Sequence, residues 1–401
     1  MRFIPFIMLF FVSIVSLDAM QTPKPSAATT PTPEQSAKPI AIAIHGGAGT
    51  IRRSAMTPEK EAQYRAVLTQ ALYAGHEVLK RGGNALDAVS AAVMIMEDSP
   101  LFNAGKGAVL TAEGAVELDA AIMDGSNLKA GAVCGVRGVK NPIVLARRVM
   151  DKTAHVMLTG KGAERFAEEQ GFERMPDAYF ITERRAQELQ RAQQNTTQKP
   201  LPPDETPGST TPRNTAPKRD SSQQKRSEAL PGQTSQSQRN QKSVAYNDTA
   251  PLEEGSHEGK KFGTVGAVAL DKNGNIAAAT STGGMTNKKY GRVGDAPIIG
   301  AGTYANNVTC AVSATGHGEY FIRSVVAHDI AALIEYKQFS LERAADEVVM
   351  KKLVERGGSG GIIAIDGKGN IAMPFNSEGM YRGCITADGK IRVEIFRSEE
   401  K

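Results

Sequence analysis

The chain is organised around one stretch, Gly263-Thr264-Val265-Gly266-Ala267-Val268-Ala269-Leu270-Asp271. Here a glycine and a threonine stand directly before a short apolar strand, and a long polar tract precedes them. A threonine that begins a buried strand could be freed by cleavage of its own peptide bond, which would place a hydroxyl nucleophile and an α-amine base on one residue. The alternative interpretation is that Thr264 is a β-branched strand residue without chemical function.

Composition indicates a globular protein of one large domain or two ordinary ones. The chain has 401 residues, of which 40% are hydrophobic and 23% charged. The net charge of +5 comes largely from basic residues between Lys199 and Lys242. Because these are not interleaved with aromatic side chains, as in proteins that bind single strands, we expect no nucleic-acid partner.

The N-terminal segment is typical of an export signal. Residues 3–17 are almost entirely apolar, follow Arg2 and precede Asp18-Ala19-Met20-Gln21, so residues 1–20 are predicted to be a signal peptide. The apolar run is shorter than the roughly 20 residues of a spanning helix, although an uncleaved N-terminal anchor is the alternative. Residues 21–38 read as a flexible leader. The mature protein is therefore expected to be exported and free of the membrane.

Neither the cysteines nor the first glycine-rich segment predicts a separate reactive centre. Cys134, Cys310 and Cys384 are too few, and odd in number, for a disulfide framework, which favours buried free thiols. His45 follows the apolar run 40–44 and precedes Gly46-Gly47-Ala48-Gly49. This segment lacks the Lys-Ser/Thr of a phosphate-binding loop, and His45 is interpreted as a structural strand-end histidine, with catalysis as the alternative.

Apolar periodicity predicts alternating groups of helices and strands, with Asn-Gly and Gly-rich hairpin turns at 271–275 and 366–370. Because antiparallel connections outnumber βαβ units, the pattern favours an α+β fold. Helices are expected to start at Thr57-Pro58 and at Asn84, and over 141–150, 159–169, 182–191, 320–336 and 340–353. Strands are expected at 40–44, 108–111, 116–123, 128–136, 265–270, 276–281, 298–304, 308–314, 362–365, 371–373, 380–386 and 391–396.

The polar tract over residues 192–260 is predicted to be a disordered linker. It is dominated by Gln, Ser, Thr, Pro, Lys and Arg and has almost no apolar residues, so it cannot offset the entropy of ordering. A loop of this length is unusual within a compact domain. Cleavage at its end would turn it into a free tail.

Eight motifs occur in an order that resembles the plant-type L-asparaginase / isoaspartyl peptidase family of N-terminal-nucleophile hydrolases. The resemblance covers nearly all of residues 40–186 and 260–386. The motifs are His45-Gly46-Gly47-Ala48-Gly49, Pro100-Leu101-Phe102-Asn103-Ala104-Gly105, Glu117-Leu118-Asp119-Ala120, Met123-Asp124-Gly125, Gly263-Thr264-Val265-Gly266, Thr280-Ser281-Thr282-Gly283-Gly284, Gly291-Arg292-Val293-Gly294-Asp295 and Thr315-Gly316-His317-Gly318-Glu319.

The resemblance implies a four-layer αββα sandwich whose precursor cleaves itself between Gly263 and Thr264. Residues 39–263 would form an alpha subunit and residues 264–401 a beta subunit. Together, residues 39–401 would make one catalytic domain, and two such pairs would assemble as (αβ)2. Two features depart from the family: the linker is longer than usual, and the export signal is not universal. The signal suggests a Gram-negative periplasm.

Catalytic roles follow from the resemblance. It makes Thr264 the nucleophile, places the Thr282 hydroxyl beside it, and assigns the oxyanion to the Thr315 hydroxyl and the Gly316 N–H. Without the family, Thr282 is a strand threonine and Thr315-Gly316 a plain turn. Because glycine has no Cβ, Gly263 would not hinder attack on its carbonyl.

Substrate-binding roles also follow from it. Arg292 would hold the substrate α-carboxylate, Asp295 the α-ammonium, and the Gly318 backbone the amine. Asn103 would lie in a loop that lines the site. An exposed Arg292–Asp295 salt bridge, worth little, is the alternative.

The family also implies a structural sodium ion and no cofactor for the chemistry. Its ligands would be backbone carbonyls, which leave no side-chain signature in a sequence. The positions that match are Met96, Glu97, Ser99, Phe102, Ala104 and Lys106.

The activity implied is hydrolysis of β-aspartyl dipeptides, with L-asparagine as a slower small-molecule substrate. Glycosylasparaginase shares the fold and nucleophile, but Thr282-Gly283-Gly284 followed by Met285-Thr286-Asn287 favours the peptidase branch. A non-catalytic exported binding protein is the third alternative. Retention of Thr264, Thr282, Thr315, Arg292 and Asp295 argues against it.

Overall fold

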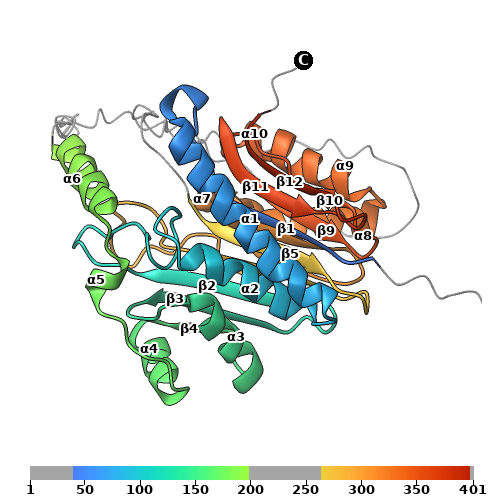
Figure 1. Cartoon of the computed structure of the whole chain (residues 1–401), viewed down its shortest axis with the longest axis horizontal. Helices are drawn as coiled ribbons and strands as arrows, with labels where there is room; N and C mark the ends of the chain where they lie inside the picture. Colours follow the sequence, from blue (N-terminus) through green and yellow to red (C-terminus); the bar gives the residue numbers. More distant parts are fainter. Residues whose placement is uncertain (1–38, 198–262, 398–401) are drawn as a thin grey trace, which may run out of the picture. The chain divides into compact units, whose positions relative to one another are not determined.

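The computed structural model describes residues 39–197 and 263–397 (Figure 1). The predicted signal peptide and leader, and most of the predicted linker, lie outside the described residues. Among the helices described, none has the length and apolar character needed to cross a membrane.

Two stacked β-sheets form the centre of the described part. The larger has the strand order β12 (Ile391–Phe396), β11 (Gly379–Ile385), β1 (Ala41–Gly49), β5 (Val265–Leu270), β6 (Ile276–Thr282), β2 (Leu118–Asp124), β3 (Ala130–Val136), β4 (Met157–Thr159). The smaller has the order β10 (Ile371–Ala372), β9 (Gly360–Asp366), β8 (Cys310–Gly316), β7 (Thr303–Ala305). Apart from β3 and β4, the paired strands run antiparallel. The predicted α+β class is confirmed.

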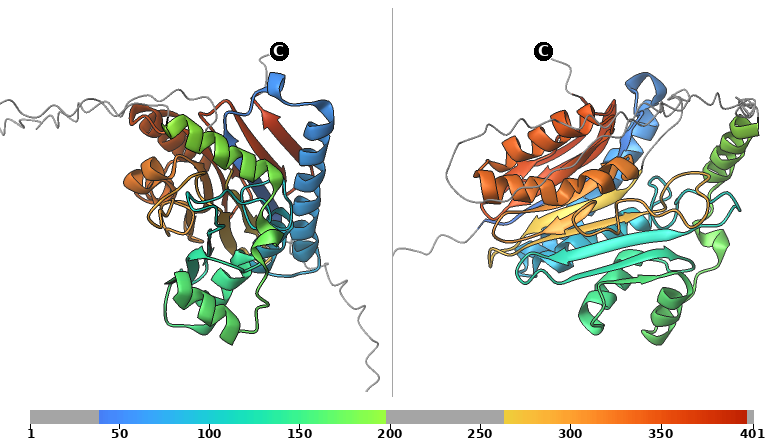
Figure 2. Two further views of the ribbon diagram at one scale, coloured as in Figure 1. Left: turned by 90° about the vertical axis from the view of Figure 1, so that its left-hand side faces the viewer. Right: turned by 180° about the vertical axis from the view of Figure 1, so that it is seen from behind.

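Helices cover the outer faces of both sheets, and Figure 2 shows α1 on the opposite side of the strands from α8 and α9. The helices before Gly263 are α1 (Pro58–Lys80), α2 (Ala85–Glu97), α3 (Pro142–Lys152), α4 (Gly160–Glu169), α5 (Asp177–Phe180) and α6 (Glu183–Thr197), with a 3-10 turn over Arg53–Ala55. Those after it are α7 (Gly318–Ser324), α8 (Val326–Lys337), α9 (Leu341–Asp346) and α10 (Leu353–Glu355), with a π-helical segment over Glu347–Lys352.

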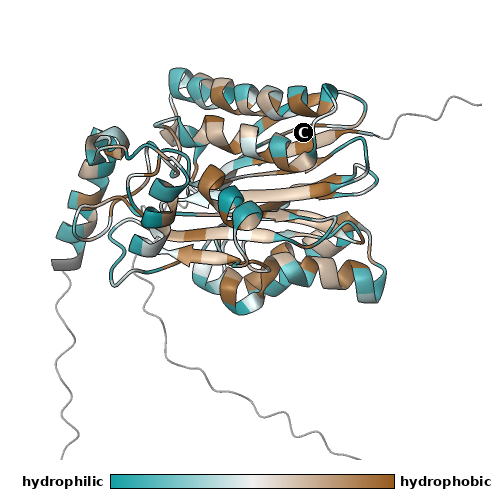
Figure 3. Ribbon diagram, turned by 90° about the horizontal axis from the view of Figure 1, so that it is seen from below, coloured by the Kyte–Doolittle hydropathy of each residue, from teal (hydrophilic) through white to brown (hydrophobic). Residues whose placement is uncertain are grey.

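The central strands are buried on both faces, and successive side chains along a strand point to opposite faces. In β1, Ile42 and Ile44 pack in the core shared with α1 and α2, whereas Ala41 and Ala43 pack against the smaller sheet. The hydropathy colours of Figure 3 show these strands as mostly apolar, while the outer helices carry both polar and apolar residues. A strand that is apolar on both faces belongs in the middle of such a stack.

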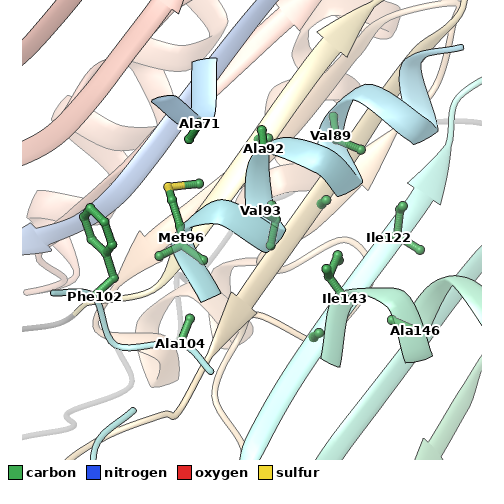
Figure 4. Packing of buried hydrophobic residues seen from close by; sticks show 14 of the residues in the cluster. Ala71, Val89, Ala92, Val93, Met96, Phe102, Ala104, Ile122, Ile143 and Ala146 are labelled. Atoms are coloured by element: carbon green, nitrogen blue, oxygen red, sulfur yellow. The ribbon is translucent and has the colours of Figure 1, made fainter. Parts of the chain in front are cut away.

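Small residues let α2 approach α1 and the larger sheet closely. A Cβ at Gly75 of α1 would overlap the Ile42 side chain and lie 2.7 Å from the Ala88 carbonyl oxygen of α2. In the same core, Figure 4 shows Val89, Ala92, Val93 and Met96 of α2 near Ile122 of β2 and Ile143 of α3. The alanines at this contact therefore reflect close packing rather than helix propensity alone.

The helix starts and hairpins that have local chemical signals are confirmed. Thr57 and Asn84 accept hydrogen bonds from the amides three residues later, and Pro58 occupies the first position of α1. In the β5–β6 turn the Asp271 carboxylate accepts from the Asn273 and Asn275 amides. Asp366 repeats this arrangement between β9 and β10. The three cysteines are buried and free, as expected.

Two predicted strands are wrong in whole or in part. Residues 108–111 form only isolated bridges, because Thr111 N donates to Ala115 O and the chain turns back at once. The strand predicted over 298–304 shrinks to β7. Its first half is a turn in which the Ile298 amide donates to Asp295 O and Gly300 has a φ of 92°.

Two predicted boundaries also need correction. The helix predicted over 320–336 is broken at Val325, whose φ is 49°, because the His328 amide donates to Gly300 O instead of continuing α7. The linker predicted from residue 192 is wrong in its first six residues, since α6 continues through Thr197 and Gln193 donates to Ala112 O at 3.0 Å. Both outcomes depend on contacts with distant loops, which periodicity does not reveal.

Glu97, at the end of α2, joins three elements by a buried carboxyl group. Its Oε1 accepts from Ser281 Oγ of β6 at 2.6 Å and from Ile143 N of α3 at 3.1 Å. Complete burial raises the pKa of Glu97 to about 8, against the hydrogen bonds that favour the charged form. The group is therefore mostly neutral at pH 7.

Glu97→Ala is expected to lower the free energy of unfolding by about 2–4 kcal/mol, because it leaves a cavity and two unpaired donors. Glu97→Gln keeps the shape and the acceptor, and should cost less than about 1 kcal/mol at pH 5. The folded-state pKa lies above the ordinary 4.5, so the stability that Glu97 contributes falls as the pH rises from 4.5 to about 8. The free energy of unfolding of the glutamine variant should therefore increase relative to that of the wild type over that pH range.

Thermal unfolding of the three proteins at pH 5 and pH 8 measures both effects. Equal losses for alanine and glutamine, or a glutamine variant that gains nothing at pH 8, would show that Glu97 does not act as a buried neutral acid.

Candidate active site

Pairing of β5 with β6 brings two predicted catalytic threonines together. Val265 pairs with Ser281, so Thr264, directly before β5, lies beside Thr282 at the end of β6. The Thr264 hydroxyl donates to Thr282 Oγ1 at 3.2 Å, and Gly284 N donates to the same oxygen at 3.0 Å. Both threonines are buried. The contact between their hydroxyls favours the catalytic interpretation of each over the strand-residue one.

Asn103 holds the carbonyl that Thr264 would attack. In the uncleaved chain, Asn103 N donates to Gly263 O at 3.1 Å. The Asn103 side chain is fixed in turn, donating to Gly284 O at 2.7 Å and accepting from Val109 N at 2.8 Å. A Cβ on Gly263 would lie 2.8 Å from Asn103 Cβ, so glycine permits this approach.

Two arginines of α6 hold the loop that carries Asn103. Arg185 Nε donates to Gly107 O at 2.6 Å, and Arg184 Nη2 donates to Leu101 O at 3.0 Å. Arg185 is buried, which lowers its pKa. The sequence indicated only a polar helix here. The adjacent pair of arginines was the one feature that could have indicated a contact between this helix and the loop. The two contacts lie on either side of Asn103 and fix its loop from both ends.

Thr315 and Gly316 end β8, an inner strand of the smaller sheet. Thr315 Oγ1 accepts from Ala48 N of β1 at 3.3 Å, and the residue is fully buried. A Cβ on Gly316, whose φ is 155°, would lie 2.5 Å from Ser359 O. The hydroxyl is thus positioned by β1 and the turn requires glycine. The oxyanion role of the pair stays a prediction.

Arg292, Asp295 and Gly318 meet in one place. A Cβ on Gly318 would lie 2.8 Å from Arg292 Nη2 and 2.9 Å from Asp295 Oδ1. Arg292 forms a two-pronged ion pair with Glu319, both contacts being 2.9 Å. Asp295 is only 4% exposed. The alternative of an exposed Arg292–Asp295 salt bridge is therefore wrong.

Glu319 is a site residue to which sequence reasoning assigned no role, although it ends one of the motifs. Half-burial opposes its ionisation, but the hydrogen bonds and charge of Arg292 hold the pKa of Glu319 below its ordinary value. It uses the Nε and Nη2 donors of Arg292. Nη1 remains on the side of Gly284 and Gly294. The ion pair thus orients the guanidinium.

Asp295 is a buried side chain whose carboxylate can accept a further hydrogen bond. Its Oδ2 has no hydrogen-bond partner within the described residues. Burial raises the pKa of Asp295 to about 7, opposed by a backbone hydrogen bond and by the charge of Arg292. A cationic group placed here would restore the charged form and pair with Oδ2.

The loop predicted to hold sodium has a carbonyl-lined interior. A Cβ on Gly105, whose φ is 48°, would overlap Glu97 O. On Gly107 it would lie 2.8 Å from Phe102 O. Carbonyls thus crowd both glycines, and oxygen ligands are those that hard cations prefer. The described residues contain no cluster of three or more His, Cys, Asp or Glu side chains suited to a metal.

Two pockets elsewhere on the described surface contain none of the predicted catalytic residues. One lies beside Arg52 and Glu378, and the other beside Phe339 and Lys368. A small pocket reaches the scissile bond and is lined in part by Tyr64, Asn103, Arg184, Gly263 and Tyr381. Chemistry and not pocket size therefore locates the candidate site.

Comparison with known proteins agrees with this geometry. Residues 38–395 match the asparaginase family. The chain belongs to the asparaginase family. Relatives in this family include an isoaspartyl peptidase of Escherichia coli K12, 47% identical over 358 residues that make up 89% of this chain and 96% of that protein. An isoaspartyl peptidase of Salmonella typhimurium LT2 is 48% identical over 89% of this chain and 98% of its own length. A probable isoaspartyl peptidase/L-asparaginase of Arabidopsis thaliana is 39% identical over 89% of this chain and 98% of its own length.

The resemblance inferred from the eight motifs is thereby confirmed at the level of the family. In this asparaginase-family chain, the His45 side chain forms a hydrogen bond with the Thr264 carbonyl and, among the described contacts, none with the Thr264 hydroxyl. The sequence allowed a structural or a catalytic histidine, and the contact with a main-chain carbonyl favours the structural interpretation.

Proposed function

We propose that this protein is a self-activating amidohydrolase that cleaves β-aspartyl dipeptides and L-asparagine through an acyl-enzyme on Thr264. One observation carries the proposal: the Thr264 hydroxyl contacts Thr282 while Asn103 holds the carbonyl of Gly263. The names of the relatives, isoaspartyl peptidase and isoaspartyl peptidase/L-asparaginase, support the substrate class.

Self-cleavage starts from the contacts around the scissile bond. Thr264 Oγ1 attacks the Gly263 carbonyl carbon, and its proton leaves toward Thr282 Oγ1, the acceptor that it already faces. Negative charge develops on Gly263 O, to which Asn103 N–H already donates. The C–N bond breaks as its nitrogen takes up the same proton, relayed by the Thr282 hydroxyl, which gives an ester on Oγ1 and a free α-amine on Thr264. Water then hydrolyses the ester and leaves a carboxylate on Gly263.

The mature nucleophile repeats this chemistry on a substrate. The new α-amine, with an ordinary pKa of about 7.7–8.0, takes the hydroxyl proton as Oγ1 attacks the β-carbonyl. The oxyanion is stabilised by the Thr315 hydroxyl and Gly316 N–H. Ammonia or an amino acid leaves with the proton, and water releases aspartate from Thr264.

Substrate orientation comes from the charged pair near Gly318. The α-carboxylate binds the edge of Arg292 that Glu319 leaves open, and the α-ammonium binds Asp295 Oδ2. Gly318 leaves room for the amine because a side chain there would meet both residues.

Several broader features belong to the same proposal. The stacked sheets and their helices would be the four-layer αββα sandwich of N-terminal-nucleophile hydrolases, with alpha and beta subunits divided after Gly263. Two such pairs assemble as (αβ)2. The carbonyls of Met96, Glu97, Ser99, Phe102, Ala104 and Lys106 would hold a structural sodium ion, which fixes the Asn103 loop. The N-terminal segment directs the protein to the periplasm.

A denaturing gel, N-terminal sequencing and three substrates test the proposal. We expect two fragments, the smaller starting at Thr264, and release of leucine from β-Asp-Leu faster than release of ammonia from L-asparagine. Faster cleavage of GlcNAc-asparagine would indicate a glycosylasparaginase. A single intact chain without hydrolysis would indicate a binding protein.

The pH dependence of KM should report the charge of Asp295. Because the carboxylate must be ionised to bind the substrate ammonium, we expect KM for β-Asp-Leu to rise about tenfold per pH unit below about 7. The α-amine of Thr264 also titrates near this range, but it acts on kcat. Asp295→Asn should raise KM at pH 8 and flatten its pH profile while the pH dependence of kcat remains. An unchanged KM profile in this variant would remove Asp295 from ammonium binding.

A further inference from the structure

The antiparallel ladder between β1 and β5 stops two residues short of Thr264. Its last pair is His45 with Gly266, and beyond it β1 has a bulge between His45 and Gly47. The Thr264 carbonyl therefore receives no amide of this ladder. The His45 side chain takes over, with Nδ1 3.0 Å from Thr264 O.

A row of buried hydroxyls continues from the other nitrogen of His45. Nε2 lies 2.8 Å from Ser313 Oγ, which lies 2.7 Å from Thr280 Oγ1, which lies 2.6 Å from Thr303 Oγ1. All four side chains are 0% exposed. They come from four strands, β1, β8, β6 and β7, and lie among residues that are otherwise mostly apolar. Burial of so many polar groups is costly unless each is paired.

Counting protons gives the row a direction. A carbonyl only accepts, so the proton of neutral His45 sits on Nδ1, and Nε2 must accept from Ser313. Ser313 has then used its single proton, so Thr280 donates to Ser313 and Thr303 donates to Thr280. Burial lowers the pKa of His45 to about 3, which keeps the imidazole neutral and the direction fixed over the working pH range.

Gly266 is the residue that makes the row possible. A Cβ there would overlap Ser313 Oγ and lie 2.5 Å from His45 Nε2. The glycine two residues after the nucleophile thus leaves space for the contact between histidine and serine, which explains its place in the Gly263-Thr264-Val265-Gly266 motif.

We propose that His45 is a positioning residue that fixes the main chain of the nucleophile, with the row of Ser313, Thr280 and Thr303 holding the other nitrogen of its ring. The proposal rests on the proposed function of Thr264. Cleavage removes the peptide bond on the amino side of Thr264, so Val265 becomes its only covalent anchor. The hydrogen bond to Thr264 O then holds the peptide plane about which the amine and hydroxyl turn. A nucleophile displaced by about 1 Å loses about 10²-fold in rate.

A matched pair of amide variants tests this role. In His45→Asn the amide nitrogen replaces Nδ1 and keeps the bond to Thr264 O, whereas in His45→Gln it replaces Nε2 and loses that bond. We expect kcat for β-Asp-Leu to fall about tenfold in the asparagine variant and about 10²-fold in the glutamine variant. Because Arg292 and Asp295 are untouched, KM should stay within about twofold in both. Equal kcat values for the two variants would overturn the proposal.

A second measurement, the tautomer of His45 in the wild type, does not depend on the folding of these variants. In wild-type protein labelled with ¹⁵N-histidine, His45 should be neutral with the proton on Nδ1 from pH 5 to pH 8. Ser313→Ala should leave the proton on Nδ1, because the Thr264 carbonyl only accepts, but should free the other side of the ring and lower kcat about tenfold. A proton on Nε2 in the wild type, or a Ser313→Ala variant with unchanged kcat, overturns the proposal. An inactive wild type with the proton on Nδ1 instead refutes the proposed function and leaves the His45 contact standing.

Discussion

Thr264→Ala is expected to yield a single uncut chain with no measurable hydrolysis of β-Asp-Leu. The variant lacks the hydroxyl that contacts Thr282, so neither the Gly263 carbonyl nor a substrate carbonyl is attacked. Loss of a nucleophile leaves at most a residual rate, and we expect a decrease of at least about 10⁴-fold. A denaturing gel after purification and leucine release measure the two effects.

Thr264→Ser is the matched control, because it keeps the hydroxyl and removes only the methyl group. The methyl group restricts χ1, so the serine variant should cleave itself and its substrate, but about 10–100-fold more slowly. The thermal midpoint of each variant should remain near that of the wild type, since residue 264 lies at a strand start and not in the centre of a core. Two fragments or full activity in the alanine variant would contradict the role of Thr264.

The parts of the fold that were predictable have local chemical causes. Thr57 and Asn84 cap their helices with their own side chains, and Asp271 closes its hairpin with its own carboxylate. The break at Val325 was not predictable, because the carbonyl that replaces the next helical partner belongs to Gly300, and nothing within the apolar pattern of 320–336 signals it.

The candidate site also has a part that was predictable from the sequence and a part that was not. The motifs identified Thr264, Thr282, Arg292 and Asp295, and the structure brings the first two into contact and the last two to Gly318. The sequence did not reveal residues that act by holding another site residue in place. Arg185 reaches Gly107 from a helix that looked merely polar, and its effect on Asn103 appears only when the loop is folded against it.

Arg292→Ala is expected to weaken substrate binding severely while leaving self-cleavage almost intact. The precursor offers no free α-carboxylate at Gly263, so cleavage should stay within about threefold of the wild-type rate. A substrate carboxylate loses its two-pronged donor, and Glu319 loses its partner and remains as a like charge nearby. Together these effects should reduce kcat/KM by about 10²–10³-fold, mainly through KM.

Glu319→Gln separates the two contributions, because it removes the charge of the partner but keeps the Arg292 guanidinium. If the ion pair only orients Arg292, this variant should raise KM about tenfold or less and leave kcat near the wild-type value. Arg292→Lys should resemble alanine more than wild type, since an ammonium cannot bind Glu319 and a substrate along two separate edges. Parallel loss of self-cleavage and hydrolysis in Arg292→Ala would place this arginine in the support of the nucleophile, and the substrate carboxylate would then require another cation.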